Sequence, residues 1–209
     1  WLLERLPRGR VIGVDGSESM VAEARRALAA YGDRLAFIHS DLLELELDEP
    51  VDAVFSNATF HWIADHDRLF ARLRAALKPG APLVAQCGGE GNVAEFEAAI
   101  EHAIAQPEFA SFFAGWPTPY NFVGPAETEK RLRNAGFEDV RCWLEGKTIE
   151  PDSPRDFAAA VGLAPHLERL PKQQRDSFVD AVVERLQNPV VFHYVRLNID
   201  ARAGDRAHD

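Results

Sequence analysis

Cysteine is scarce in this sequence, since its 209 residues include only Cys87 and Cys142. The two lie far apart, and neither belongs to a Cys-x-x-Cys motif. They therefore indicate the reduced thiols of a cytoplasmic protein rather than a disulfide framework or a zinc site. Long apolar runs are also lacking, because no stretch approaches the roughly 18 residues that a membrane-spanning helix needs. The mixed segment 1–7 is too short for a signal peptide.

Positive charge is in deficit as well. Lys and Arg number 23 against 33 Asp and Glu, which gives a net charge of -10. Such a surface repels phosphate backbones and anionic lipid headgroups, so the sequence argues against nucleic-acid and membrane-surface partners. Hydrophobic residues make up 46% of the chain and charged residues 27%, a balance that predicts a packed core. The length predicts a single domain over residues 1–209.

Strand-like and helix-like segments alternate through the first 90 residues, which predicts an α/β fold with a parallel sheet covered by helices. Strands are expected at 10–15, 35–39, 51–56 and 82–87. Helices are expected at about 17–31, with Ser17 as the N-cap, and at about 65–77.

The second half of the chain begins with a helical and aromatic-rich insertion, expected at about 90–125 within the single domain. Beyond it, the sequence predicts helices at about 128–135, 154–161 and 172–187, and strands at 137–149 and 190–199. Residues 200–209 are expected to form a frayed tail.

Polar residues follow three successive predicted strands: Asp15 ends the first, Asp41 follows the second and Asn57 follows the third. In an open parallel sheet, ligands bind beyond the carboxyl ends of the strands. An Asp at the first strand end can accept both hydroxyls of a ribose, and an Asp at the next can accept from the exocyclic amine of an adenine. The row therefore predicts an adenosine-binding site. The alternative for each residue alone is an ordinary turn or cap.

Several segments resemble those of the class I S-adenosylmethionine-dependent methyltransferases. They are Val11–Met20, Ser40–Leu42, Asp52–Ala58 and Leu77–Gly80. The pair His61-Trp62 and the segments 132–137 and 167–171 resemble, more narrowly, the trans-aconitate methyltransferase branch. The resemblance implies a Rossmann-like fold, with a mostly parallel twisted sheet, helices on both faces and an antiparallel final strand.

The same resemblance implies S-adenosylmethionine as the cofactor. The cofactor-binding positions would be Asp15, Gly16, Ser17, Met20, Asp41, Leu42 and Asn57. Asp15 would bind the ribose hydroxyls, Asp41 the adenine amine, and Asn57 would lie near the methionine part. His61 and Trp62 would face the methyl acceptor, which makes them the candidate catalytic residues.

One departure from the family is large. The family opens with a strand and a glycine-rich loop under the amino-acid part of the cofactor, and neither is present in these residues. We therefore expect an N-terminally truncated sequence, the alternative being a sheet that closes up or a partner that fills the gap. In the family's topology the absent strand lies between the strand ending at Asp15 and the strand ending at Asn57. Each of these would lose a ladder partner.

Methyl transfer from a sulfonium is an in-line displacement, which requires alignment and exclusion of water and no metal. A carboxylate acceptor is already nucleophilic at pH 7, whereas an amine, phenol or carbon acid needs a base, for which His61 is the candidate. Trp116 and Tyr120 are candidate walls of an acceptor pocket, or plain core packing. Arg196 is expected to form a surface salt bridge, with pairing to a substrate carboxylate as the alternative. His39 and His66 have no metal-ligand spacing to any other residue, so no metal is expected.

The leading prediction is methyl transfer to a small-molecule acceptor, a carboxylate resembling trans-aconitate. One alternative is a truncated, non-catalytic Rossmann-like module. Another is a short-chain dehydrogenase, which would need a Tyr-x-x-x-Lys motif that this sequence lacks. The identity of the acceptor and the oligomeric state are left open.

Overall fold

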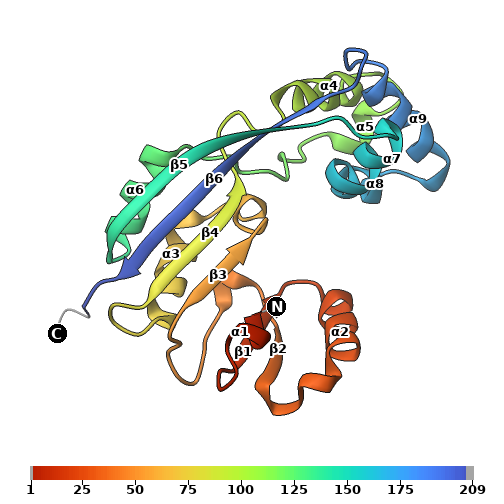
Figure 1. Cartoon of the computed structure of the whole chain (residues 1–209). Helices are drawn as coiled ribbons and strands as arrows, with labels where there is room; N and C mark the ends of the chain where they lie inside the picture. Colours follow the sequence, from red (N-terminus) through yellow and green to blue (C-terminus); the bar gives the residue numbers. More distant parts are fainter. Residues whose placement is uncertain (1, 206–209) are drawn as a thin grey trace.

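The computed structural model describes residues 2–205, in which helices flank two separate sheets (Figure 1). The strands are β1 (Val11–Asp15), β2 (Leu35–His39), β3 (Val54–Asn57), β4 (Pro82–Gly88), β5 (Phe137–Ile149) and β6 (Phe192–Ala203). The α-helices are α1 (Leu2–Arg5), α2 (Glu18–Ala27), α3 (His66–Ala76), α4 (Ala94–Ile104), α5 (Ala110–Phe113), α6 (Pro125–Asn134), α7 (Pro154–Phe157), α8 (Ala164–Arg169) and α9 (Lys172–Val183). Shorter turns are η1 (Ala29–Arg34), η2 (Leu42–Glu44), η3 (Phe60–Trp62) and the π-helical η4 (Ala158–Gly162).

The strand pairing has the α/β character that the sequence predicts. β1 pairs with β2 and β3 with β4, both in parallel, and β6 joins β4 in the antiparallel sense with β5 beyond it. The final strand is therefore antiparallel, as expected. Within residues 2–205 no ladder joins β1 to β3. The interruption lies between the strands ending at Asp15 and Asn57, where the sequence led us to expect it.

Local signals set the helix boundaries. The Ser17 hydroxyl accepts from Met20 N (3.4 Å) at the start of α2, and the Asp65 carboxylate accepts from Arg68 N (2.9 Å) at the start of α3. Both are N-cap contacts that satisfy helix donors otherwise left without partners. After α3, Gly80 adopts φ 73°, a conformation that favours glycine, and turns the chain into β4.

One hydrophobic core lies between the β3–β4–β6–β5 sheet and helices α3 and α6. Its members include the fully buried Leu69 and Phe70 of α3, Leu132 of α6, and Leu83 and Leu197 of the sheet. The opposite face of the sheet is less covered, since Phe55 is 63% and Val84 45% exposed. The second face is therefore where a ligand can approach the strands.

A second hydrophobic core is formed by helices and by the start of β6. Phe96, Phe109 and Phe113 from the predicted insertion pack with Leu163 and Phe178 from the later helices. The segment expected at 90–125 is thus joined by residues beyond 154, and we call the whole group the helical cluster (α4, α5, α7–α9 and η4). It lies at the far end of the long β5–β6 ribbon (Figure 1).

The C-terminal prediction is wrong for residues 200–205. Asp200–Ala203 continue β6, and Ala201 and Ala203 are buried against the first core. Arg74 donates from Nε to Gly136 O (3.1 Å) and from Nη2 to Gly204 O, which fastens this end of the chain. Residues 206–209 lie outside the described part. No helix within residues 2–205 is long and apolar enough to cross a membrane.

Candidate functional site

The first part of the candidate site is the carboxyl end of the parallel β1–β2 pair. Asp15 is in register with His39, and Ser40 N donates to Asp15 O (3.1 Å). The His39 ring donates from Nε2 to Gly16 O (3.1 Å), which ties the turn after β1 to the end of β2. Asp41 follows at once, so the two predicted carboxylates lie at the same end of this sheet.

Both carboxylates keep one oxygen available. Oδ1 of Asp15 accepts from Ser17 N (2.8 Å), and Oδ1 of Asp41 accepts from Leu43 N (2.9 Å). These are the turn and cap roles left open by the sequence. Within residues 2–205, no hydrogen bond or ion pair uses Oδ2 of either residue. Each exposed carboxylate can therefore still accept from a ligand.

Four more of the predicted cofactor positions lie next to these two carboxylates in the chain, whereas Asn57 lies at the end of β3. Gly16 and Ser17 form the turn after β1, Met20 stands on the first turn of α2 with 58% of its surface exposed, and Leu42 opens η2. Oxygen acceptors beside the exposed Met20 and the half-buried Leu42 suit the hydroxyls, amine and flat base of an adenosine. The chemistry of these residues therefore fits the adenosine part of S-adenosylmethionine.

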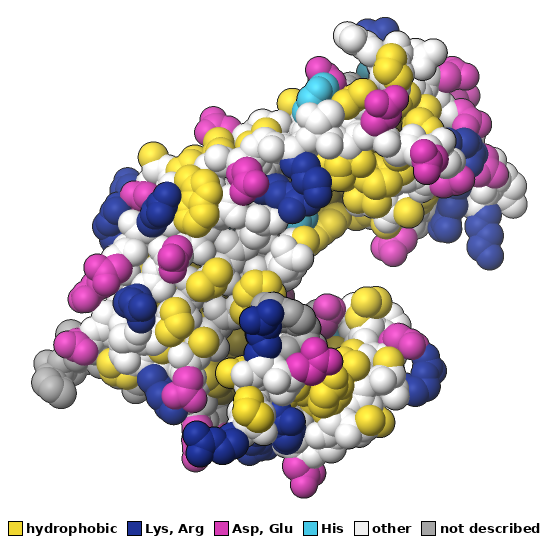
Figure 2. All heavy atoms as spheres, in the orientation of Figure 1, with side chains coloured by type: hydrophobic (Ala, Val, Ile, Leu, Met, Phe, Trp, Pro, Cys, Tyr) yellow, Lys and Arg dark blue, Asp and Glu magenta, His cyan; other side chains and the backbone are white. Residues whose placement is uncertain are grey.

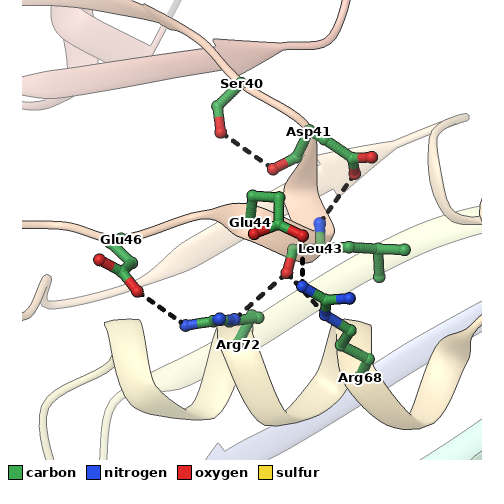
Figure 3. Close-up of polar contacts among 7 residues, drawn as sticks. All are labelled: Ser40, Asp41, Leu43, Glu44, Glu46, Arg68 and Arg72. Carbon is green, nitrogen blue, oxygen red and sulfur yellow. Dashed lines mark hydrogen bonds and ion pairs between the residues drawn. The ribbon is translucent and has the colours of Figure 1, made fainter.

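Two arginines fasten the segment after Asp41 to α3 (Figure 3). Leu43 O accepts from Arg68 Nε (3.0 Å) and from Arg72 Nε (3.2 Å). Arg68 also pairs with Glu44, and Arg72 pairs with Glu46 (3.1 Å). Since α3 follows the end of β3, these contacts connect the β1–β2 strand ends to the larger sheet.

The end of β3 has strained backbone. Asn57 closes the strand, and Ala58 follows with φ 57° while donating its N–H to Gln86 O (2.7 Å). Val93, before α4, has φ 47°. Left-handed backbone is costly for a non-glycine residue, and most of all for a β-branched one, so such strain points to a functional site. Both residues line the same cavity.

That cavity has a volume of about 280 Å³ and lies between the ends of β3, β4 and β6 and the helical cluster. Figure 2 shows the surface hollowed between this cluster and the part of the molecule that holds β1 and β2, with hydrophobic and Lys or Arg side chains on the upper wall of the hollow. The residues that line the cavity include Asn57, Ala58, His61, Trp62, Gln86, Cys87, Tyr120, Phe122, Val161, Gly162, Tyr194 and Arg196. The predicted acceptor residues His61, Trp62 and Tyr120 and the candidate Arg196 are therefore brought together, whereas Trp116 packs in the helical core.

His61 is held as a neutral ring. Its Nδ1 accepts from Gly88 N (3.1 Å), so in the neutral form the proton is on Nε2. Burial, together with the smaller effect of the nearby His66, lowers the pKa of His61 from 6.5 to about 4. At pH 7 the ring therefore offers one N–H donor and has no free lone pair.

Two other titratable groups of the cavity are held neutral, in their case with the proton bound. Burial raises the pKa of the Cys87 thiol to about 12. Burial likewise raises the pKa of the Tyr120 phenol, whose hydroxyl donates to Gly162 O. Neither group can remove a proton from an acceptor near neutral pH.

Arg196 stands on β6 in the wall of the cavity. Its Nη1 donates to Gln86 Oε1 (2.9 Å), and Gln86 Nε2 donates to Asn198 Oδ1 (2.6 Å). Within residues 2–205, Arg196 forms no salt bridge, so the expectation of a surface ion pair is wrong. Gln86 and Asn198 were not singled out from the sequence. The signal was there, since Gln86 is one polar residue in the apolar run 82–87, and Arg196 and Asn198 share a face at strand spacing.

No three His, Cys, Asp or Glu side chains of the described residues are grouped to hold a metal ion. His39 instead bonds Gly16 O, and the buried His66 ring donates from Nε2 to Phe60 O (2.9 Å).

Sequence comparison finds similar proteins over most of the chain. A family profile described as "Methyltransferase domain" matches residues 1–80. The trans-aconitate 2-methyltransferase of Acidovorax ebreus (strain TPSY) is 40% identical over 197 residues, which cover 88% of this chain and 71% of that relative.

Comparison with solved structures finds the same fold. The YcgJ protein of Bacillus subtilis matches with a TM-score of 0.63 and 14% identity, over 94% of this chain and 83% of that one. The phosphoethanolamine N-methyltransferase 2 of Haemonchus contortus, solved with S-adenosyl-L-methionine, matches with a TM-score of 0.55 and 22% identity. The match covers 94% of this chain and 44% of that enzyme, so the chain spans less than half of its length. At these identities the likeness shows the fold alone.

Proposed function

The chain belongs to the class I S-adenosylmethionine-dependent methyltransferases, and from that premise we propose that it methylates a carboxylate of a small organic acid. Membership sets aside the short-chain dehydrogenase alternative. S-adenosylmethionine supplies the electrophilic methyl group of this family. What this chain must do is hold that cofactor, place the acceptor and keep water away.

Cofactor binding is assigned to the strand ends. Asp15 would accept the ribose hydroxyls and Asp41 the adenine amine, in each case through the oxygen that no backbone N–H uses. The adenine ring would lie between Leu42 and the exposed Met20. Asn57 would lie toward the methionine part of the cofactor. The tie between η2 and α3 supports this assignment, because it holds the segment after Asp41 against the helix that follows β3.

The absence of a base among the described cavity residues carries the choice of acceptor. His61 has no free lone pair, and Cys87 and Tyr120 hold their protons. An amine, phenol or carbon acid would have to lose a proton, whereas a carboxylate is already ionised at pH 7. The cavity therefore favours an acceptor that needs alignment only.

His61 and Trp62 are proposed to place this acceptor. The Nε2–H of His61 can donate a hydrogen bond to a carboxylate oxygen of the acceptor. Trp62 is 44% exposed at the cavity and lies 5.2 Å from Tyr120 between ring centroids, so it can cover a flat, unsaturated acid. The relatives support this class of acceptor, since the name of the Acidovorax enzyme gives a carboxylic acid as its substrate.

The test is a methyl-transfer assay with labelled S-adenosylmethionine. Small acids, trans-aconitate among them, are compared with their amides and with amines and phenols of similar size. We expect label to enter the acids alone, as an ester that mild alkali cleaves. Label in an amine or phenol, with none in any acid, would contradict the proposal.

A further inference from the structure

We propose that Arg196 binds an anionic group of the acceptor other than the carboxylate that is methylated, and that Gln86 positions it there. This inference rests on the proposed function and adds a residue that selects acceptors with a second negative charge.

Arg196 is the one charged side chain among the described residues that line the cavity. Its hydrogen-bond partner Gln86 is neutral and therefore does not offset the positive charge of the guanidinium. The acidic residue opposite it in the sheet is Glu145 on β5, and the two form no ion pair. An unpaired, half-buried guanidinium facing an apolar cavity is suited to an anionic ligand, which it can bind through two parallel hydrogen bonds.

Gln86 is itself held in one orientation. Its Nε2 donates to Asn198, which is only 8% exposed, so its Oε1 is turned toward Arg196. Gln86 pairs in register with Asn198 and Gly88 with Arg196, which places the three side chains on one face of adjacent strands. The arrangement fixes a long, mobile side chain before any ligand arrives.

Charge decides which group of the acceptor Arg196 holds. An ion pair with the reacting carboxylate would draw electron density from the attacking oxygen and weaken it as a nucleophile. A guanidinium on a second, non-reacting anion has no such cost. The net charge of -10 repels anionic acids at a distance, so a local cation is needed to bind them.

The experiment measures binding of acids to the purified chain by calorimetric titration. The probes are fumarate and crotonate, which differ in that crotonate has a methyl group where fumarate has its second carboxylate. We expect wild type to bind fumarate at least about tenfold more tightly, and Arg196→Gln to abolish that preference while leaving S-adenosylmethionine affinity within about twofold.

Three variants sharpen the result. Gln86→Glu should also weaken fumarate binding, because the new carboxylate would pair with Arg196. Arg196→Lys should keep part of the preference for fumarate over crotonate. Arg202→Gln is the matched control, since Arg202 lies on the same face of β6, bonds Gly80 O (3.1 Å) and does not line the cavity. In the transfer assay the loss should appear in the acceptor KM more than in kcat.

Equal fumarate binding by wild type and Arg196→Gln, or no binding by either, would overturn the inference. So would a loss confined to S-adenosylmethionine, which would place Arg196 at the cofactor. An equal loss for both acids would place it on the reacting carboxylate. If wild type binds the diacid through Arg196 and yet transfers no methyl group to any acid, the proposed function fails, while Arg196 remains a binding site for an anionic group.

Discussion

His61 is expected to stay neutral until the pH falls to about 4. Burial of the ring and the nearby His66 both lower its pKa from 6.5. A shift of this size corresponds to about 3 kcal/mol against protonation in the folded chain, so at pH 7 about one ring in a thousand carries a second proton. Because Gly88 N–H occupies Nδ1, the neutral ring should be protonated at Nε2 from pH 5 to 9.

The assay is nitrogen NMR of the histidine rings, with the His61 signal assigned by its loss in His61→Asn. The asparagine oxygen can still accept from Gly88 N–H. We therefore expect this variant to fold and to lose no more than about tenfold in turnover. Removal of a general base would bring a much larger loss, of about 10²–10⁴. His61→Phe leaves the N–H without a partner and should lose about 1–3 kcal/mol of unfolding free energy.

Three results would refute this account of His61. They are a titration midpoint near 6.5, a ring protonated at Nδ1, or a loss of two or more orders of magnitude in kcat for His61→Asn with acceptor and cofactor affinities unchanged. Any of them would return His61 to the role of base and would remove the argument for a carboxylate acceptor.

The other predictions concern the cofactor, the cavity wall and the helical cluster. Asp15→Asn should weaken S-adenosylmethionine binding by about 1.5–3 kcal/mol in calorimetric titration, while Asp33→Asn, at an exposed carboxylate in η1, should not; equal affinities would remove Asp15 from the site. Tyr120→Phe loses the bond to Gly162 O and should raise the acceptor KM, with cofactor affinity unchanged; a change in cofactor affinity instead would contradict this. Burial lowers the pKa of His166 to about 4, so the unfolded chain takes up a proton below pH 6.5 that the folded chain does not. Unfolding free energy, measured by urea denaturation, should therefore fall between pH 6.5 and 4, and His166→Phe should reduce that fall by about 3 kcal/mol; an unchanged fall would show that His166 is not its source.

Local pattern was sufficient for most of the strands and helices. Alternation and capping residues such as Ser17 located them, because these signals act over a few positions. The end of β6 was missed for the opposite reason. Its buried residues, Ala201 and Ala203, are small and give a weak hydrophobic signal, and the strand is held by pairing with β4 and with Phe137 of β5. Such contacts join segments that are far apart in the chain, so the local sequence does not predict them.

The site divides in the same way. Asp15 and Asp41 could be located because the ends of adjacent parallel strands meet at one edge. The contact between Gln86, Asn198 and Arg196 depends on the register of β4 against β6, which are more than a hundred positions apart in the chain. The protonation of His61 likewise depends on burial and on one backbone N–H. Neither could be inferred from residue types.

The most direct test of the proposed function is the chemical nature of the methylated product. Acceptor and labelled S-adenosylmethionine are incubated with the chain, and the product is analysed by mass spectrometry before and after mild alkali. We predict a methyl ester, from which alkali releases labelled methanol and regenerates the free acid. A labelled product that withstands alkali, with the methyl group on nitrogen or carbon, would contradict the proposal of carboxylate methylation without a base.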